Sequence, residues 1–118
     1  MGFVMKYDLE ERTLKFAKNV RTFIKQIPKT ISNIEDVKQL IRSSGSMGAN
    51  YIEANESLSK RDFVMRIKIC KKESKETIYW LKMLDLDSKP QLEERRENLI
   101  NEAGELMKIF GSILEKVK

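Results

Sequence analysis

The sequence contains no histidine, one cysteine, two prolines and five glycines among its 118 residues. Without histidine, the chain lacks the commonest metal ligand and general base of proteins. A single cysteine cannot build an internal disulfide framework. We therefore expect no metal, no cofactor and no enzymatic activity.

Long apolar runs are also missing. No stretch approaches the ~20 apolar residues that a membrane-spanning helix requires, and the opening MGFVMKYD lacks the apolar region of a signal peptide. Lys6 stands where a myristoylation signal beginning at Gly2 would have Ser or Thr. These features predict a cytoplasmic protein without a membrane partner.

The residues that are present suit a soluble helical protein, because 41% are hydrophobic and 35% are charged. The length suits one domain spanning residues 1–118. After a lead-in over residues 1–7, helical patterns cover residues 9–27, 32–55, 59–84 and 90–117. Four helices of similar length with short connections predict an all-α fold, an antiparallel up-down-up-down four-helix bundle.

The expected helix boundaries depend on capping residues and prolines. Asp8, Ser32 and Ser59 each precede an acidic residue three positions later, a pattern typical of a helix start. Pro28 is expected to end the first helix, and Pro90 is well placed as the first residue of the fourth.

Apolar and small residues recur at steps of three and four, which predicts the core face of each helix. The expected core positions are Leu9, Phe16, Val20, Phe23 and Ile27; Ile34, Val37, Ile41, Ser44, Gly48 and Tyr51; Phe63, Ile67, Cys70, Ser74, Thr77, Leu81 and Leu84; and Leu92, Leu99, Ala103, Leu106, Phe110, Ile113 and Val117. Arg96 has the same helical spacing, between Leu92 and Leu99, and is the one charged residue at a core position of the fourth helix.

The segment 43–49, SSGSMGA, is unusually rich in small side chains. A glycine inside a helix costs roughly 1 kcal/mol relative to alanine, and close packing of two backbones is the simplest compensation. A phosphate-binding loop is the alternative. The segment lacks the G-x-x-x-x-G-K-[ST] spacing and a preceding strand, so we favour close packing.

Positive charge is concentrated on the first and third expected helices. Lys68, Lys71, Lys72 and Lys75 fall within about 100° of arc on one helix, beside its core face. The first helix adds Lys18, Arg21 and Lys25. We predict that these residues bind the phosphates of a nucleic acid, although a merely solvated face would have the same composition.

The other flank of the third helix carries Arg66, Ile69, Glu73 and Trp80. One bundle core cannot absorb both Ile69 and Trp80, so we predict an oligomer interface formed by Ile69, Glu73 and Trp80. Cys70 lies on the core face and is expected to be a small buried side chain.

Two strings carry a resemblance to a known family. RSSGSMGANYIEANESLSKRDF contains Ser46, Gly48, Ala49, Asn50 and Glu53, and KKESKETIYWLKML contains a K-E-x-x-E-T-x-Y-W-L pattern from Lys72 to Leu81. The first helix, YDLEERTLKFAKNV, fits as well. With these residues the chain resembles the four-helix-bundle family of the 23S ribosomal RNA intervening-sequence protein, also called S23 ribosomal protein-like. The resemblance spans Tyr7 to Leu86, whereas the fourth helix matches only in pattern.

The resemblance implies a bundle that assembles into a homopentamer, and it brings no catalytic residues. It also implies kinship with accessory proteins of diversity-generating retroelements, which engage nucleic acid and a reverse transcriptase. We predict a non-catalytic protein that binds nucleic acid, RNA in particular, through the basic surface of a homo-oligomer. The alternative is a protein-interaction scaffold or an accessory subunit of a nucleic-acid enzyme. An enzyme is disfavoured because Glu53, Glu73 and Glu76 lack the E-x-x-H pairing of di-iron bundles. Salt bridges with Arg42, Arg61 or Arg66 explain these glutamates better.

Overall fold

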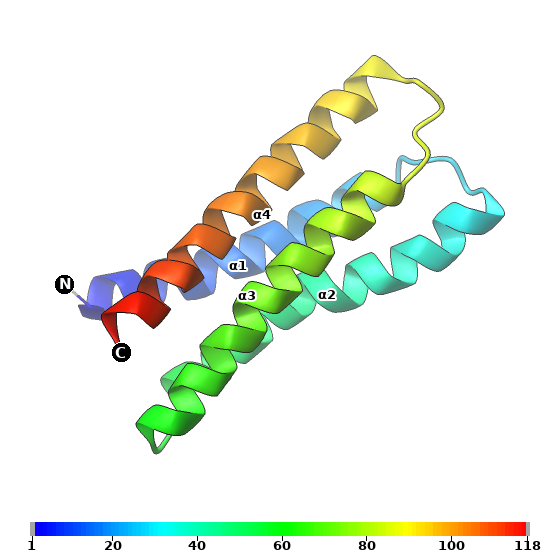
Figure 1. Cartoon of the computed structure of the whole chain (residues 1–118). Helices are drawn as coiled ribbons and strands as arrows, with labels where there is room; N and C mark the ends of the chain where they lie inside the picture. The colour runs from blue at the N-terminus through cyan, green and yellow to red at the C-terminus, as the bar shows by residue number, and fades with distance from the viewer. Residues whose placement is uncertain (1, 118) are drawn as a thin grey trace.

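The computed structural model describes the backbone of residues 2–117 and the side chains of residues 9–117. Its four helices are α1 (Gly2–Ile24), α2 (Ile31–Asn55), α3 (Lys60–Met83) and α4 (Pro90–Lys116). They alternate in direction and form an elongated bundle of 46 × 24 × 19 Å (Figure 1). The predicted antiparallel four-helix bundle is confirmed, and the start of α1 and the end of α4 lie at the same end of it.

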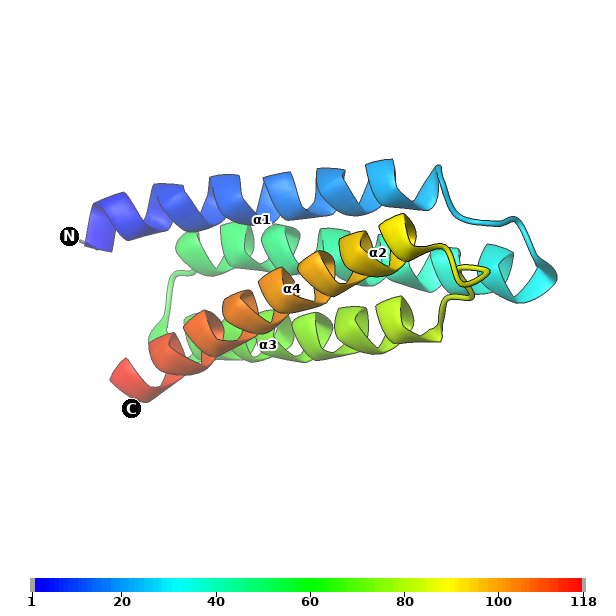
Figure 2. The ribbon, with the colours of Figure 1, turned by 90° about the horizontal axis from the view of Figure 1, so that it is seen from above.

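The helices follow one another around the bundle. Helix α1 packs against α2 and α4, and α3 packs against the same two helices. Among the described residues α1 and α3 do not pack against each other, and they lie on opposite sides of the bundle (Figure 2). This diagonal placement determines which surface features can lie together.

Two of the expected helix starts are confirmed and two are wrong. Ser59 caps α3 by accepting a hydrogen bond from the backbone N–H of Asp62 at 3.1 Å, and α4 begins at Pro90. The cap of α2 is Thr30 rather than Ser32, because its Oγ1 accepts from the N–H of Asn33 at 3.1 Å. The helix start predicted at Asp8 is wrong because α1 already begins at Gly2.

The first helix is therefore shifted towards the N-terminus relative to the sequence prediction. Gly2–Tyr7 is helical rather than a lead-in, and Met1 lies outside the described residues. The helix ends at Ile24, three residues before the predicted end. Gln26 N–H closes a tight turn on the carbonyl of Phe23 at 3.0 Å, and Pro28 disfavours helical geometry in the residue before it. Ile27 is buried nonetheless.

The core faces of α1, α3 and α4 agree with the predicted periodicity, with partial exposure at Phe63, Ile113 and Val117. The face of α2 is rotated near its start. Ile34 is 48% exposed there, whereas Asn33 and Leu40 are buried. Asn33 takes the inward position because its amide donates to the carbonyls of Pro28 and Asp85, both at 2.8 Å.

Arg96 is accommodated on the core face of α4 because its guanidinium donates to carbonyls at the C-terminal end of α3. Its Nη1 donates to the carbonyl of Leu84 at 2.6 Å and to that of Leu81 at 3.3 Å. The last carbonyls of a helix lack partners within the helix, and a cation there is favourable. Arg96 thus fastens α4 to the C-terminal end of α3. Within residues 2–117, no helix has the length and apolarity needed to cross a membrane.

Candidate nucleic-acid interface

The predicted lysines of α3 form an exposed row along one side of the helix. Lys68, Lys71, Lys72 and Lys75 are all exposed, and none forms an ion pair with another described residue. Helix α3 as a whole carries eight Lys or Arg and three Asp or Glu. We call these four lysines the α3 ridge. Its charges are unneutralised within residues 9–117 and therefore available to an external anion.

The α3 ridge borders α4. A Cβ placed on Gly111 of α4 would lie 3.9 Å from both Cε and Nζ of Lys71, so the lysine stem extends over that glycine. Glycine leaves room for this crossing. The ridge therefore belongs to the face of the bundle formed by α3 and α4.

The basic residues predicted on α1 lie elsewhere. Lys18, Arg21 and Lys25 are exposed. Arg21 donates to the carbonyl of Ala17 at 3.2 Å, and its Nη2 would lie 3.8 Å from a Cβ on Gly45 of α2. Lys18 and Arg21 therefore belong to the face formed by α1 and α2, opposite the α3 ridge, whereas Lys25 lies just past the end of α1, beside the α1–α2 connection. One copy of the chain does not bring the two basic groups together.

Of the three residues predicted for an oligomer interface, Glu73 has its partner within the chain. It is buried, and its carboxylate accepts from Arg42 at 3.1 and 3.3 Å. Arg42 also reaches Glu76 at 3.0 Å, which confirms that both glutamates are salt-bridge partners. The hydrogen bond to Glu73 is the main reason that the pKa of Arg42 lies above its ordinary value. Arg66 instead donates to Oδ1 of Asn50 at 2.9 Å.

The other two residues predicted for the oligomer interface, Ile69 and Trp80, differ in their contact with the core. Trp80 is half-buried and packs against the core, whereas Ile69 is half-buried without joining the core cluster. The neighbouring Tyr79 meets the Trp80 ring edge-on at 5.1 Å and is 55% exposed. Met65 and Met83 are each 49% exposed. The sequence analysis missed Met65, Tyr79 and Met83, although their helical spacing places them on the same outward side as Ile69.

A groove between α1 and α2 is a second feature that the sequence analysis missed. It has a volume of about 410 Å³ and is lined by Glu10, Thr13, Leu14, Ala17, Lys18, Arg21, Gly45, Gly48, Ala49 and Ile52. Gly45, Gly48 and Ala49 belong to the small-residue segment whose close packing was predicted, and the structure confirms that packing at Gly48. A Cβ there would lie 2.8 Å from Oγ1 of Thr13.

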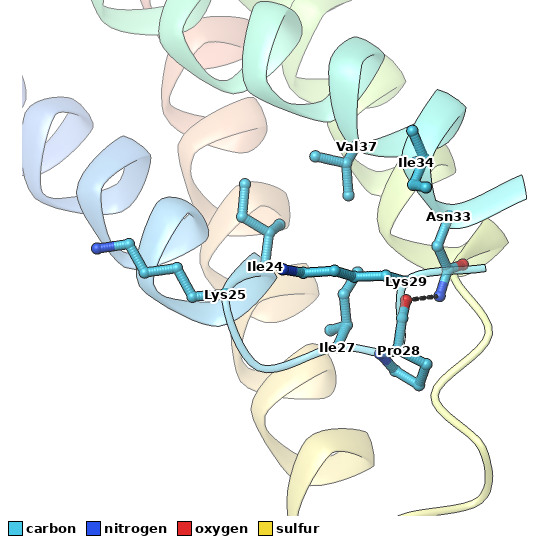
Figure 3. A pocket seen from close by; sticks show the side chains of 8 residues that line it. All are labelled: Ile24, Lys25, Ile27, Pro28, Lys29, Asn33, Ile34 and Val37. Atoms are coloured by element: carbon cyan, nitrogen blue, oxygen red, sulfur yellow. Dashed lines mark hydrogen bonds between the residues drawn. The ribbon is translucent and has the colours of Figure 1, made fainter. Parts of the chain in front are cut away.

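A pocket beside the α1–α2 connection is lined by Ile24, Lys25, Ile27, Pro28, Lys29, Asn33, Ile34 and Val37 (Figure 3). Asn33 points its amide at the Pro28 carbonyl, and Lys25 extends away from the pocket (Figure 3). The lining offers neither a carboxylate nor a thiol. Its two lysines, Lys25 and Lys29, therefore have no carboxylate in the lining with which to form a nucleophilic or acid–base pair.

Cys70 is fully buried, as predicted, and its Sγ donates to the carbonyl of Met47 at 3.4 Å. Burial raises the pKa of the thiol to about 12, so the nucleophilic thiolate is not formed at neutral pH. Among the described residues, no three Cys, Asp or Glu side chains are grouped so that they could hold a metal ion.

The described helices form a small all-α bundle with a row of exposed lysines on α3 and exposed apolar side chains such as Tyr79 and Met83 on the same helix. Residues 5–112 match the 23S rRNA-intervening sequence protein family, and the chain belongs to this family. It is also similar to the crystal structure of a protein of unknown function from the S23 ribosomal protein family of Bacteroides thetaiotaomicron. The two share 29% sequence identity with a TM-score of 0.80, over 93% of this chain and 97% of that one. No functionally curated protein matched the chain.

Proposed function

We propose that this chain is a non-catalytic, cytoplasmic RNA-binding protein that presents its basic surface as a homo-oligomer. The observation that carries the proposal is the α3 ridge, four exposed lysines without an ion-pair partner among the described residues. The name of the family, which refers to an intervening sequence of 23S rRNA, supports RNA as the nucleic acid.

Lysine ammonium groups contact phosphates without reading bases. The described helices offer no aromatic-rich sheet on which bases could stack, as RNA-recognition domains do. Binding should therefore tolerate changes in sequence and weaken steeply with salt. The logarithm of affinity falls by ~0.7–0.9 per phosphate neutralised for each tenfold rise in salt concentration.

A homo-oligomer would repeat the ridge and make attachment multivalent. Linked sites can raise the overall affinity by ~10²–10⁴ over one weak site when the geometry allows them to bind together. The family resemblance favours five copies. Light scattering on the purified protein at micromolar concentration measures the number of copies directly.

The deciding experiment compares two variants with the same change in net charge. Lys68→Glu/Lys75→Glu reverses two exposed ridge lysines, and Lys108→Glu/Lys116→Glu reverses two exposed lysines of α4. Binding to a structured RNA is measured by fluorescence anisotropy at several salt concentrations. We expect the ridge variant to lose at least tenfold in affinity and the α4 variant to lose less than threefold. Equal losses would contradict a defined site on α3.

The apolar surface around Tyr79 and Met83 favours a second candidate, a scaffold or accessory subunit for a nucleic-acid enzyme such as a reverse transcriptase. The same experiment separates the two functions. If the unmodified protein binds no RNA at low salt, the RNA-binding proposal is wrong and the scaffold becomes the better explanation.

A further inference from the structure

An exposed tyrosine lies in line with the α3 ridge. Tyr79 follows Lys68, Lys72 and Lys75 at steps of four, three and four residues, the spacing that keeps side chains on one face of a helix. Lys82 continues this face after a further step of three. All five side chains are exposed, and Tyr79 is 55% exposed. At the rise of an α-helix, the row from Lys68 to Lys82 is roughly 20 Å long.

The neighbouring tryptophan holds the ring of Tyr79. The two rings meet edge-on, with their centroids 5.1 Å apart and their planes at 79°. Trp80 itself is half-buried and packs against the core. This contact can cover at most one of the two faces of the Tyr79 ring, so the exposed side chain offers an oriented aromatic surface to a ligand.

The carboxylates of α3 leave the charge around Tyr79 positive. Glu73 is buried, and both Glu73 and Glu76 accept hydrogen bonds from Arg42. Asp62, the third acidic residue of α3, lies in the first turn of the helix, roughly 25 Å along the axis from Tyr79. An aromatic ring between lysines therefore has the composition of a surface for a ligand that is both anionic and aromatic.

We propose that Tyr79 is a stacking platform for a base of single-stranded RNA whose phosphates are bound by the α3 ridge. The inference rests on the proposed function and narrows its ligand to single strands. A base within a duplex is already stacked and paired, whereas a base of a single strand can be turned outward onto an aromatic side chain. Cationic groups that follow the backbone, combined with aromatic side chains that stack bases, are the usual means of binding single strands without reading their sequence.

Tyr79 lies away from the residues predicted for the oligomer interface. At 100° per residue, Ile69 and Trp80 lie about 80° and 100° further around α3. An oligomer that uses these two residues therefore leaves Tyr79 and the α3 ridge on its outer surface.

Electrostatic attraction and stacking predict opposite preferences. A duplex has the higher density of phosphates, and the dependence of affinity on salt is steeper for duplex DNA than for single strands, ~0.9 against ~0.7 per phosphate. Lysines alone should therefore favour a duplex. A stacking platform adds affinity only for a single strand, because only there is the face of a base accessible.

The test uses one labelled RNA strand without internal base pairing, first alone and then annealed to its complement. Tyr79→Leu removes the ring and keeps an apolar side chain, whereas Tyr79→Phe keeps the ring. Lys75→Gln is the control that removes one charge and keeps Tyr79. Fluorescence anisotropy at several salt concentrations gives the affinities and their salt dependence. Circular dichroism and light scattering first establish that helix content and molar mass equal those of the unmodified protein.

We expect Tyr79→Leu to bind the single strand at least about fivefold more weakly, the low end of what one stacked base contributes. Its affinity for the duplex and its salt dependence should stay unchanged, because no phosphate contact is lost. Tyr79→Phe should bind both RNAs like the unmodified protein. Lys75→Gln should weaken the binding of both and lower the salt dependence by ~0.7–0.9.

Three results would overturn the proposal: an unchanged affinity of Tyr79→Leu for the single strand, an equal loss for strand and duplex, or an equal loss in Tyr79→Phe. The first would leave Tyr79 available to a protein partner, as the scaffold function requires. In all three cases the α3 ridge remains an RNA-binding site. If the unmodified protein binds neither RNA at low salt, the proposed function itself is wrong, so the two failures are distinguishable.

Discussion

A Cβ on Gly48 would lie 2.8 Å from Oγ1 of Thr13 and 3.1 Å from its Cβ. Thr13 has little freedom to move away, because it is buried and its Oγ1 lies 2.8 Å from the carbonyl of Leu9, to which it donates. Helices α1 and α2 therefore approach each other at a point where only hydrogen fits. This contact explains a glycine in the interior of α2.

The first prediction is that Gly48→Ala lowers the free energy of unfolding. Overpacking costs ~1–3 kcal/mol, which should exceed the gain in helix propensity of up to ~1 kcal/mol. The control is Gly104→Ala in α4, where a Cβ would meet no atom within 4 Å. That variant should gain ~0.5–1 kcal/mol. Urea unfolding measures both, and equal stability of the two variants would contradict the close contact.

Gly48 also shows what the sequence could reveal of the fold. Small residues at helical spacing predict a close approach, but they do not name Thr13 as the partner. Ser59 and Pro90 were predictable because each stands at a break in the periodicity. Thr30, Ser32 and Asn33 all have capping side chains, and the choice among them depended on tertiary contacts. Asn33 points inward because the carbonyls of Pro28 and Asp85, in two different connections, both accept from its amide.

The candidate interface was predictable in one respect only. Helical geometry places Lys68, Lys71, Lys72 and Lys75 on one side of α3, and the structure agrees. The sequence does not show which neighbouring helix lies beside the lysine-bearing side of α3. The separation of the basic residues of α1 from those of α3 follows from their diagonal placement, which emerges only when the four helices pack together.

The second prediction concerns Asn33, whose side chain links the α1–α2 connection to the α3–α4 connection by hydrogen bonds. Its Nδ2 donates to the Pro28 and Asp85 carbonyls at 2.8 Å, and its Oδ1 accepts from the Asp85 N–H at 3.0 Å. Asn33→Ala removes these three hydrogen bonds, and a hydrogen bond of this kind contributes ~0.5–1.5 kcal/mol net. We expect the free energy of unfolding to fall by ~2–4 kcal/mol.

Asn98→Ala, at an exposed position of α4, is the control for the loss of an asparagine side chain. A surface change of this kind should alter stability by less than ~0.5 kcal/mol. Both variants are compared by urea unfolding. If Asn33→Ala unfolds at the same urea concentration as Asn98→Ala, the hydrogen bonds of Asn33 between the two connections do not stabilise the fold.

The third prediction uses the raised pKa of Cys70. Burial raises it from 9.0 to about 12, so above pH 9 the unfolded chain releases a proton that the folded chain keeps. The stability due to the neutral thiol is complete below pH 9 and is lost as pH rises towards 12. The free energy difference between the unmodified protein and Cys70→Ala should therefore shrink by roughly 1–2 kcal/mol between pH 8 and 10.5.

Urea unfolding of both proteins at the two pH values gives this difference. Burial also raises the pKa of Tyr51, but Tyr51 is present in both proteins and its effect largely cancels. A difference that is constant over this range would mean that Cys70 titrates alike in the folded and unfolded chains.

The fourth prediction concerns the ion pair of Arg42 and Glu73, whose side chains are 50% and 7% exposed. Arg42→Met leaves the buried carboxylate of Glu73 without its main donor, and a hydrogen bond to a charged group contributes ~1.5–3 kcal/mol. Arg42→Met/Glu73→Met removes both charges, and an apolar replacement of such a pair is often neutral or stabilising. The double variant should therefore recover most of the stability that the single variant loses. The control is Lys38→Met, which breaks a pair with Glu35 whose side chains are 66% and 67% exposed and should cost less than ~1 kcal/mol. Thermal and urea unfolding of the four proteins complete the comparison. If Arg42→Met costs no more than Lys38→Met, Glu73 does not depend on Arg42, and this ion pair does not stabilise the contact between α2 and α3.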